Sequence, residues 1–160
     1  MNETIRKIII TIGIFLVIIG LILLHHAYNN TSEEIKTYNF TSEEREIFAQ
    51  LVHLEAGACG QECQRAVASV VLNRLEAGYW GDTIEEVIFY PKAFSPANLI
   101  GDWTPIDEAY AAVDYVVKNG SILPPLVRYF RDDYDHQWEG YAHYKTYDNI
   151  YFGYFTNGDF

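Results

Sequence analysis

The hydrophobic pattern separates one long apolar segment from a region of mixed pattern. Residues 8–24 carry no charge, and a helix rising about 1.5 Å per residue would span roughly 25 Å over them, close to the ~30 Å hydrocarbon core of a membrane. We therefore predict a cytoplasmic tip and transmembrane anchor at 1–28, a polar tether at 29–40 and a folded domain at 41–160. A cleaved signal peptide, followed by secretion of the domain, is the alternative.

The charges beside the apolar segment predict its orientation. Arg6 and Lys7 precede it, and Glu33 and Glu34 follow it. By the positive-inside rule, the N-terminus then lies in the cytoplasm and residues from about 29 onward lie outside the cell membrane.

The next region, from about 41 to 120, has the 3.6-residue periodicity of amphipathic helices. The predicted boundaries are a capping box of Thr41 with Glu44, a helix at Glu62–Ala77 followed by Gly78, a second box of Asp82 with Glu85, and a helix capped by Thr104 with Pro105 at its first position and Gly120 at its end. In the second helix, we expect Asn73 and Arg74 to tie the helix to neighbouring loops.

The pattern changes after Pro124 and Pro125. Residues 126–130, 142–147 and 150–155 are short, rich in aromatic and β-branched residues, and separated by Gly, Asp and Asn. Helices followed by short strands predict an α+β domain with a small antiparallel sheet.

Glu55 interrupts the apolar pattern of the first domain helix. It lies four residues after Leu51 and seven after Phe48, which places it on the face directed at the core. Burial and the negative end of the helix dipole both disfavour a carboxylate, so we expect a raised pKa and a role as a general acid. The alternative is a buried glutamate that hydrogen-bonds the backbone or pairs with Arg65 or Arg74.

Cys59 and Cys63 are the two cysteines of the chain. Outside the cytoplasm, such a pair predicts a disulfide that would hold the loop behind Glu55. A reduced, inert pair is the alternative. A zinc site is the least favoured of the three interpretations, because zinc needs four ligands and only His53 lies nearby in the sequence. We therefore expect no metal site.

Composition narrows the class of partner. The formal net charge of −11 argues against a nucleic-acid partner, since neutralising phosphates requires lysine and arginine. The thirteen tyrosines are compatible with a sugar-binding site, although most such rings fill ordinary cores.

Four segments, in order, resemble the catalytic domain of SleB/CwlJ-type cell wall hydrolases. They are LVHLEAGACGQECQRAVASVVLNRL, TIEEVIFYPKAFSP, LPPLVRYFR and YDNIYFGYF, and the resemblance extends from about Glu43 to Phe155. It implies a fold related to lysozyme-like lytic transglycosylases, cleavage of peptidoglycan glycan strands, and a single catalytic glutamate, which falls on Glu55.

The implied reaction cleaves the bond between N-acetylmuramic acid and N-acetylglucosamine and leaves 1,6-anhydromuramic ends, with Glu55 as the single acid and base and with no cofactor. The other candidate acids lie in loops or at a helix start, where solvation or capping accounts for them, which favours transglycosylation over hydrolysis; they are Asp102, Asp107, Asp132, Asp133 and Asp135.

The predicted substrate-binding residues are Phe94, Ser95, Trp103, Tyr129 and Trp138. Ser95 would bind an acetamido group or steady Glu55, unless it only forms a turn before a proline. Tyr129 is expected to face the site and Phe130 the core, because neighbours on a strand point to opposite faces. Trp138, with His136, would form an aromatic rim or else belong to an exposed loop.

Three alternatives to transglycosylation remain at this point. A muramidase would hydrolyse the same bond, and a membrane-tethered glycan-binding protein would keep the fold without chemistry. A peptidase or amidase is disfavoured, because the sequence supplies neither a convincing metal cluster nor a Cys/His pair.

Overall fold

The computed structural model describes residues 2–31, 38–132 and 138–158. Half of the predicted tether, residues 32–37, lies outside these residues, as does His136. Contacts divide the chain into two units, Met1–Ile35 and Lys36–Phe160, each of which is described by itself.

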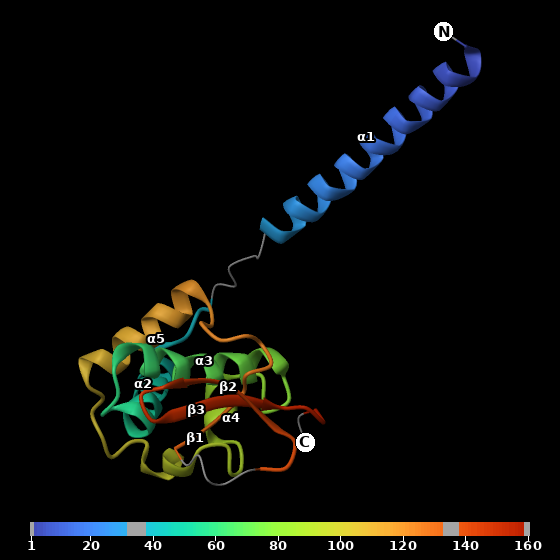
Figure 1. Ribbon diagram of the computed structural model, residues 1–160. Coiled ribbons are helices and arrows are strands. Elements are labelled where there is room, and N and C mark those ends of the chain that lie inside the picture. Colours follow the sequence, from blue (N-terminus) through green and yellow to red (C-terminus); the bar gives the residue numbers. More distant parts are fainter. Residues whose placement is uncertain (1, 32–37, 133–137, 159–160) are drawn as a thin grey trace. The chain divides into compact units, whose positions relative to one another are not determined.

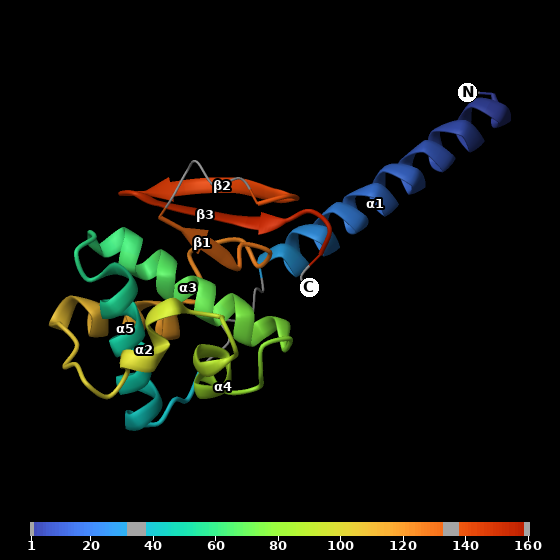
Figure 2. The ribbon, with the colours of Figure 1, turned by 90° about the horizontal axis from the view of Figure 1, so that it is seen from below.

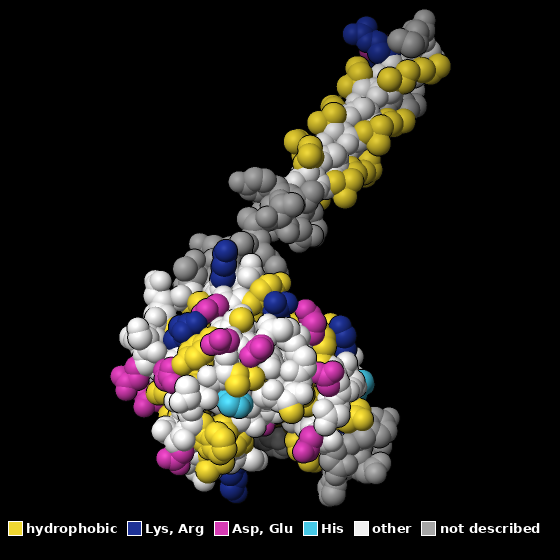
Figure 3. Space-filling view, turned by 90° about the vertical axis from the view of Figure 1, so that its left-hand side faces the viewer, with side chains coloured by type: hydrophobic (Ala, Val, Ile, Leu, Met, Phe, Trp, Pro, Cys, Tyr) yellow, Lys and Arg dark blue, Asp and Glu magenta, His cyan; other side chains and the backbone are white. Residues whose placement is uncertain are grey.

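The first unit is helix α1, Glu3–Thr31. Its segment Glu3–Leu24 has a mean hydropathy of 2.9 and is long and apolar enough to cross a membrane. Figure 3 shows apolar side chains along this helix and basic side chains at its N-terminal end. The predicted N-terminal apolar helix is therefore confirmed. Length and composition alone fit a membrane anchor and a signal sequence equally well.

The two helices that frame Glu55 begin and end close to the predicted positions. Helix α2, Ser42–Ala56, has the expected capping box, in which the Glu44 amide donates to Thr41 Oγ1 at 3.1 Å and the Thr41 amide donates to Glu44 Oε2 at 2.9 Å. Helix α3, Gln61–Ala77, ends at Gly78, whose φ of 66° is the left-handed conformation that favours glycine.

The predicted starts of the other two helices were wrong. Helix α4, Ile84–Phe89, is capped by Thr83 and Glu86, one residue later than expected, and this register buries Ile84, Val87 and Ile88. Helix α5, Asp107–Asn119, begins after Ile106 and has no side-chain cap.

A proline preference explains the late start of α5. Thr104 precedes Pro105, which biases its backbone towards an extended conformation, and the chain remains extended through Ile106. Asp107 and Glu108 then place negative charge in the first turn, where the helix dipole favours it.

The three strands form one antiparallel sheet in the order β1-β3-β2, which confirms the α+β prediction (Figure 1). Their bounds are Tyr129–Arg131 for β1, Tyr141–Tyr147 for β2 and Ile150–Phe155 for β3. Within β3, a Cβ atom at Gly153 would lie 2.3 Å from the Ala142 carbonyl oxygen of β2. This position therefore requires glycine.

Helix α3 occupies the middle of the domain. Figure 2 shows the sheet on one side of α3 and helices α2, α4 and α5 on the other. Almost every side chain from Cys63 to Arg74 is buried, as expected for a helix surrounded by other elements.

Asn73 of α3 holds an irregular segment against the helix, as predicted. Its Nδ2 donates to the carbonyl oxygens of Pro124 and Val127, both at 2.9 Å. These contacts fix the chain just before β1, and thereby help to position the strand that borders the site.

Candidate active site

Glu55 lies in the last turn of α2 and is half-buried. Burial raises the pKa of its carboxyl from the usual value near 4.5 to about 7; the Arg74 guanidinium lowers that pKa, and the Asp132 carboxylate raises it. The raised pKa agrees with the sequence prediction. Glu55 therefore exists in both protonation states near neutral pH, which a residue needs to act as an acid and then as a base.

Glu55 opens into a cleft of about 1190 Å³. Side chains from α2, α3, the 90–95 segment and the sheet line it, and its aromatic rings are Trp80, Tyr90, Phe94, Tyr129, Phe130, Trp138 and Phe155. Rings of this kind stack on the apolar faces of sugars while carboxyl and guanidinium groups bind hydroxyls. The cleft has the lining expected of a carbohydrate site.

A second hollow of about 310 Å³ meets the first at Glu55. The two share Glu55, Asp132 and Ile150, and the second continues past His53 and Cys59. Open space therefore lies on both sides of the Glu55 carboxyl, as cleavage within a polymer requires.

Arg74 connects the core to the cleft. Its Nε donates to the Arg128 carbonyl at 2.8 Å and its Nη1 to the Ala93 carbonyl at 3.1 Å, so it joins α3 to the residue that precedes β1 and to the 90–95 segment. Its guanidinium also lies 4.5 Å from the Phe94 ring centroid. This agrees with the predicted tying role, and of the two arginines considered as partners of Glu55, Arg74 is the one that lowers its pKa.

Four of the five predicted binding residues line the cleft with Glu55: Phe94, Ser95, Tyr129 and Trp138. Ser95 begins a short 3₁₀ helix, Ser95–Leu99, where a loop was expected. Their role in binding stays a prediction.

Two placements differ from the predictions. Trp103 is 54% exposed, packs edge-on against His53 with ring centroids 6.4 Å apart, and is absent from the described residues that line the cleft. Phe130, expected in the core, contacts Phe152 at a centroid distance of 5.7 Å but also lines the cleft beside Tyr129. The short, twisted β1 strand at the sheet edge presents both of its rings to the cleft.

Sequence reasoning did not assign four charged residues to the cleft that line it: Lys92, Arg131, Asp132 and Glu139. Among the described residues, Nε and Nη1 of Arg131 are buried without a hydrogen-bond partner, and its guanidinium lies 4.8 Å from the Tyr141 ring centroid. Asp132 was assigned to a solvated loop, and it is exposed, but it also faces Glu55 closely enough to raise its pKa. The pairing of β1 with β3 brings Arg131 and Asp132 to the cleft that contains Glu55.

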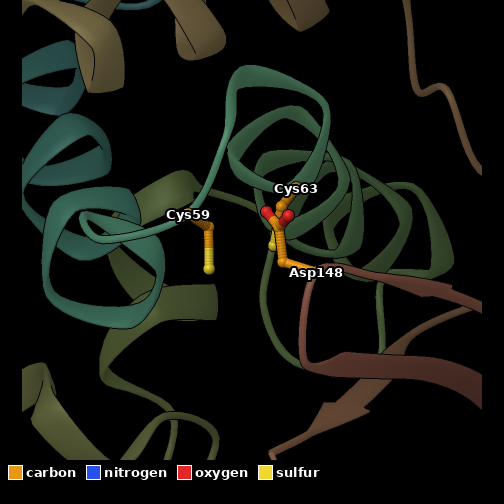
Figure 4. Close-up of side chains that lie close together, drawn as sticks. All are labelled: Cys59, Cys63 and Asp148. Carbon is orange, nitrogen blue, oxygen red and sulfur yellow. The ribbon is translucent and has the colours of Figure 1, made fainter.

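Cys59 and Cys63 are free thiols in this structure, and the predicted disulfide between them stays a prediction. Cys63 is buried in the first turn of α3 and Cys59 lies in the preceding loop. Asp148, in the turn between β2 and β3, lies beside them, and the three ligand atoms are all within 4.8 Å of one another (Figure 4). The sequence search for ligands stopped at His53 and missed this residue.

Comparison with known proteins agrees with this architecture. The model of the family described as cell wall hydrolase matches residues 59–153. The chain therefore belongs to the cell wall hydrolase family. The matched region begins four residues after Glu55, so it does not test the assignment of that residue.

Individual relatives are similar over the same region. A spore cortex-lytic enzyme of Oceanobacillus iheyensis is 33% identical over 95 residues, which make up 59% of this chain and 34% of that protein. The chain thus aligns with about one third of this relative.

Two solved structures share the fold. The catalytic domain of the germination-specific lytic transglycosylase SleB from Bacillus anthracis aligns with a TM-score of 0.65 and 22% identity, over 74% of this chain and 99% of that one. The catalytic domain of the Bacillus cereus SleB protein aligns with a TM-score of 0.62 and 23% identity, over 76% and 98% of the two chains.

The pKa of Glu55 leads to a stability prediction. A carboxyl whose pKa is higher in the folded than in the unfolded state binds more protons when folded, so stability falls as pH rises from about 4.5 to about 7. We expect Glu55→Gln, which removes the buried charge, to raise the free energy of unfolding by roughly 1–3 kcal/mol near pH 8 and to change it little near pH 4.

Urea unfolding in detergent, followed by tryptophan fluorescence, measures this effect, because all three tryptophans lie in the second unit. The exposed Glu85→Gln on α4 is the matched control and should change stability little at either pH. Destabilisation of Glu55→Gln near pH 8 would contradict the assigned environment.

Proposed function

We propose that this protein is a lytic transglycosylase that cleaves peptidoglycan between N-acetylmuramic acid and N-acetylglucosamine. The observation that carries the proposal is a half-buried glutamate, with a pKa of about 7, at the meeting point of two hollows in a cell wall hydrolase domain. Aromatic rings in the cleft supply stacking surfaces for successive sugars.

In the proposed mechanism, protonated Glu55 donates its proton to the glycosidic oxygen, and the bond from this oxygen to C1 of the muramic acid breaks. The C6 hydroxyl oxygen of the same muramic acid forms a new bond to C1 and gives its proton to the Glu55 carboxylate. The products are a 1,6-anhydromuramic end and a free N-acetylglucosamine hydroxyl, and Glu55 is protonated again. This cycle consumes no water.

Arg74 and Arg131 have different proposed roles. Arg74 holds the cleft walls and limits the rise in the pKa of Glu55. Two donors of Arg131 are buried at the edge of the same cleft without a partner among the described residues, and they suit an acceptor or carboxylate on the substrate. Acidic groups occur on the peptide and lactyl parts of the proposed substrate, and Arg131 would position the strand through them.

Hydrolysis is the second candidate, and Asp132 favours it. Hydrolytic glycosidases generally use two carboxylates, and Asp132 lines both hollows beside Glu55. In that reaction, Asp132 would activate a water molecule or stabilise the positive charge that develops on the sugar. The product would then carry a reducing muramic acid.

For localisation, we propose that α1 remains attached as a single-pass anchor, with the N-terminus in the cytoplasm and the domain outside. Arg6 and Lys7 at the start of the apolar segment support this orientation. The exterior placement puts the cleft on the side of the membrane where peptidoglycan lies.

The first test of function is product analysis by mass spectrometry after incubation with purified peptidoglycan. We expect 1,6-anhydromuropeptides, and a rate that falls as pH rises above about 7, because Glu55 must begin each cycle protonated. Glu55→Gln should lower the rate by a factor of roughly 10² or more, whereas Glu85→Gln should not. Retained activity in Glu55→Gln would refute the assignment of the acid.

Asp132→Asn separates the two mechanisms. Transglycosylation predicts that anhydro products persist and that the alkaline limb of the pH profile moves to lower pH, since the Asp132 charge raises the pKa of Glu55. Hydrolysis predicts reducing ends in the wild type and a loss of roughly 10²-fold or more in the variant. The exposed Asp102→Asn, outside the described cleft lining, is the control.

The anchor is tested on cells that produce the whole chain. Intact mass spectrometry of the membrane fraction should find the N-terminal segment still attached, and protease added to cells stripped of wall should remove the domain. A mature protein that lacks residues 1–28, found in the medium, would show instead that the segment is a cleaved signal peptide.

A further inference from the structure

The cluster of Cys59, Cys63 and Asp148 is not used by the proposed reaction. It joins three elements that are distant in sequence, namely the loop after α2, the first turn of α3 and the turn between β2 and β3 (Figure 4). We propose that these side chains bind one thiophilic divalent cation of the zinc type. The site is separate from the chemistry of Glu55.

The geometry suits such an ion. Ligands that surround a tetrahedral zinc ion at about 2.0–2.3 Å lie roughly 3.3–3.8 Å from one another. The sulfur atoms and the carboxylate oxygen are already within 4.8 Å of one another, so contraction by less than about 1 Å at each ligand completes the site.

A fourth ligand is also at hand. Asn149 Oδ1 lies 4.0 Å from Cys59 Sγ, and Cys59 and Asp148 are accessible enough for water to reach the ion. The Asp148 carboxylate already receives a hydrogen bond of 2.8 Å from the Gly60 amide. This bond orients the carboxylate towards the cysteines.

Charge favours a cation at this cluster. Two thiolates and the Asp148 carboxylate would together supply the negative charge that a divalent ion neutralises. Binding would release the two thiol protons to solvent.

The ion would fasten the loop that follows Glu55. Residues 57–60 connect the end of α2 to α3, and the turn at Asp148 leads into Ile150, which lines both hollows. Binding would tie the catalytic helix end to the sheet. This is the structural role first sought in a disulfide, performed by three ligands and not two.

Cobalt(II) tests the proposal, because thiolate ligands give it a near-ultraviolet charge-transfer band and tetrahedral geometry gives it strong visible bands. The whole chain in detergent, reduced with a phosphine, is titrated with Co²⁺ and then with Zn²⁺. We expect one Co²⁺ per chain with both sets of bands, and their loss when Zn²⁺ displaces it.

Variants assign the ligands. Cys63→Ser leaves one thiol and should abolish the strong thiolate charge-transfer band and one-to-one binding. Asp148→Asn should weaken binding by roughly 100-fold or more. The exposed Asp82→Asn is the matched control and should bind like the wild type. Zinc should also raise the melting temperature of the wild type but not that of Cys63→Ser.

Three results would overturn the proposal. They are absence of the thiolate band in the reduced wild type, unchanged binding in Asp148→Asn, and a Cys59–Cys63 disulfide in protein isolated from its own cells. These measurements need no substrate, so the metal-site proposal is tested independently of the transglycosylase proposal.

Discussion

The domain depends on four buried polar side chains of helix α3, which pair with the backbone of neighbouring segments. Side chains of Gln64, Ser69, Asn73 and Arg74 are nearly inaccessible, and each bonds the backbone of a segment that lies outside a helix. A buried donor or acceptor without a partner costs about 1–3 kcal/mol, so these pairs fix where the irregular segments lie. The segment 90–95 and strand β1, next to the backbone groups that Arg74 bonds, also line the cleft.

This constraint links folding to the site. Arg74 can be buried because two carbonyl groups accept its hydrogen bonds and aromatic rings pack against it, and its charge is then fixed near Glu55. Arg74, which the packing of the domain holds in place, thereby lowers the pKa of the candidate acid Glu55. Replacing it would disturb the walls and the pKa together, so its effects on stability and chemistry are not separable by a single substitution.

Local sequence signals predicted the elements but not all of their contacts. The Thr41 box, the Gly78 end and the alternating strands depend on neighbours within a few residues, and they were predicted correctly. The start of α4 lies one residue later than predicted because Thr83 and Glu86 form a complete capping box there, and this register also buries Ile84. Glu55 was visible for a similar reason, since a carboxylate on an apolar helix face is detectable from periodicity alone.

The rest of the site needed the sheet. Arg131 and Asp132 reach the cleft only because β1 pairs with β3, and Asp148 reaches the cysteines only because a tight turn follows β2. No periodicity in the sequence encodes these distances. Trp103 is the opposite case. It was predicted to bind substrate, but its ring packs against His53 and does not line the cleft among the described residues.

One carboxyl can serve as both acid and base only if neither of its protonation states is strongly favoured. Burial alone would push the pKa of Glu55 further up, and Arg74 alone would pull it down towards a permanently ionised state. Their opposition leaves the pKa at about 7, where donating and recovering a proton both cost little. If transglycosylation is the reaction, the cleft therefore needs Arg74 near Glu55 for the cycle as much as the core needs it for packing.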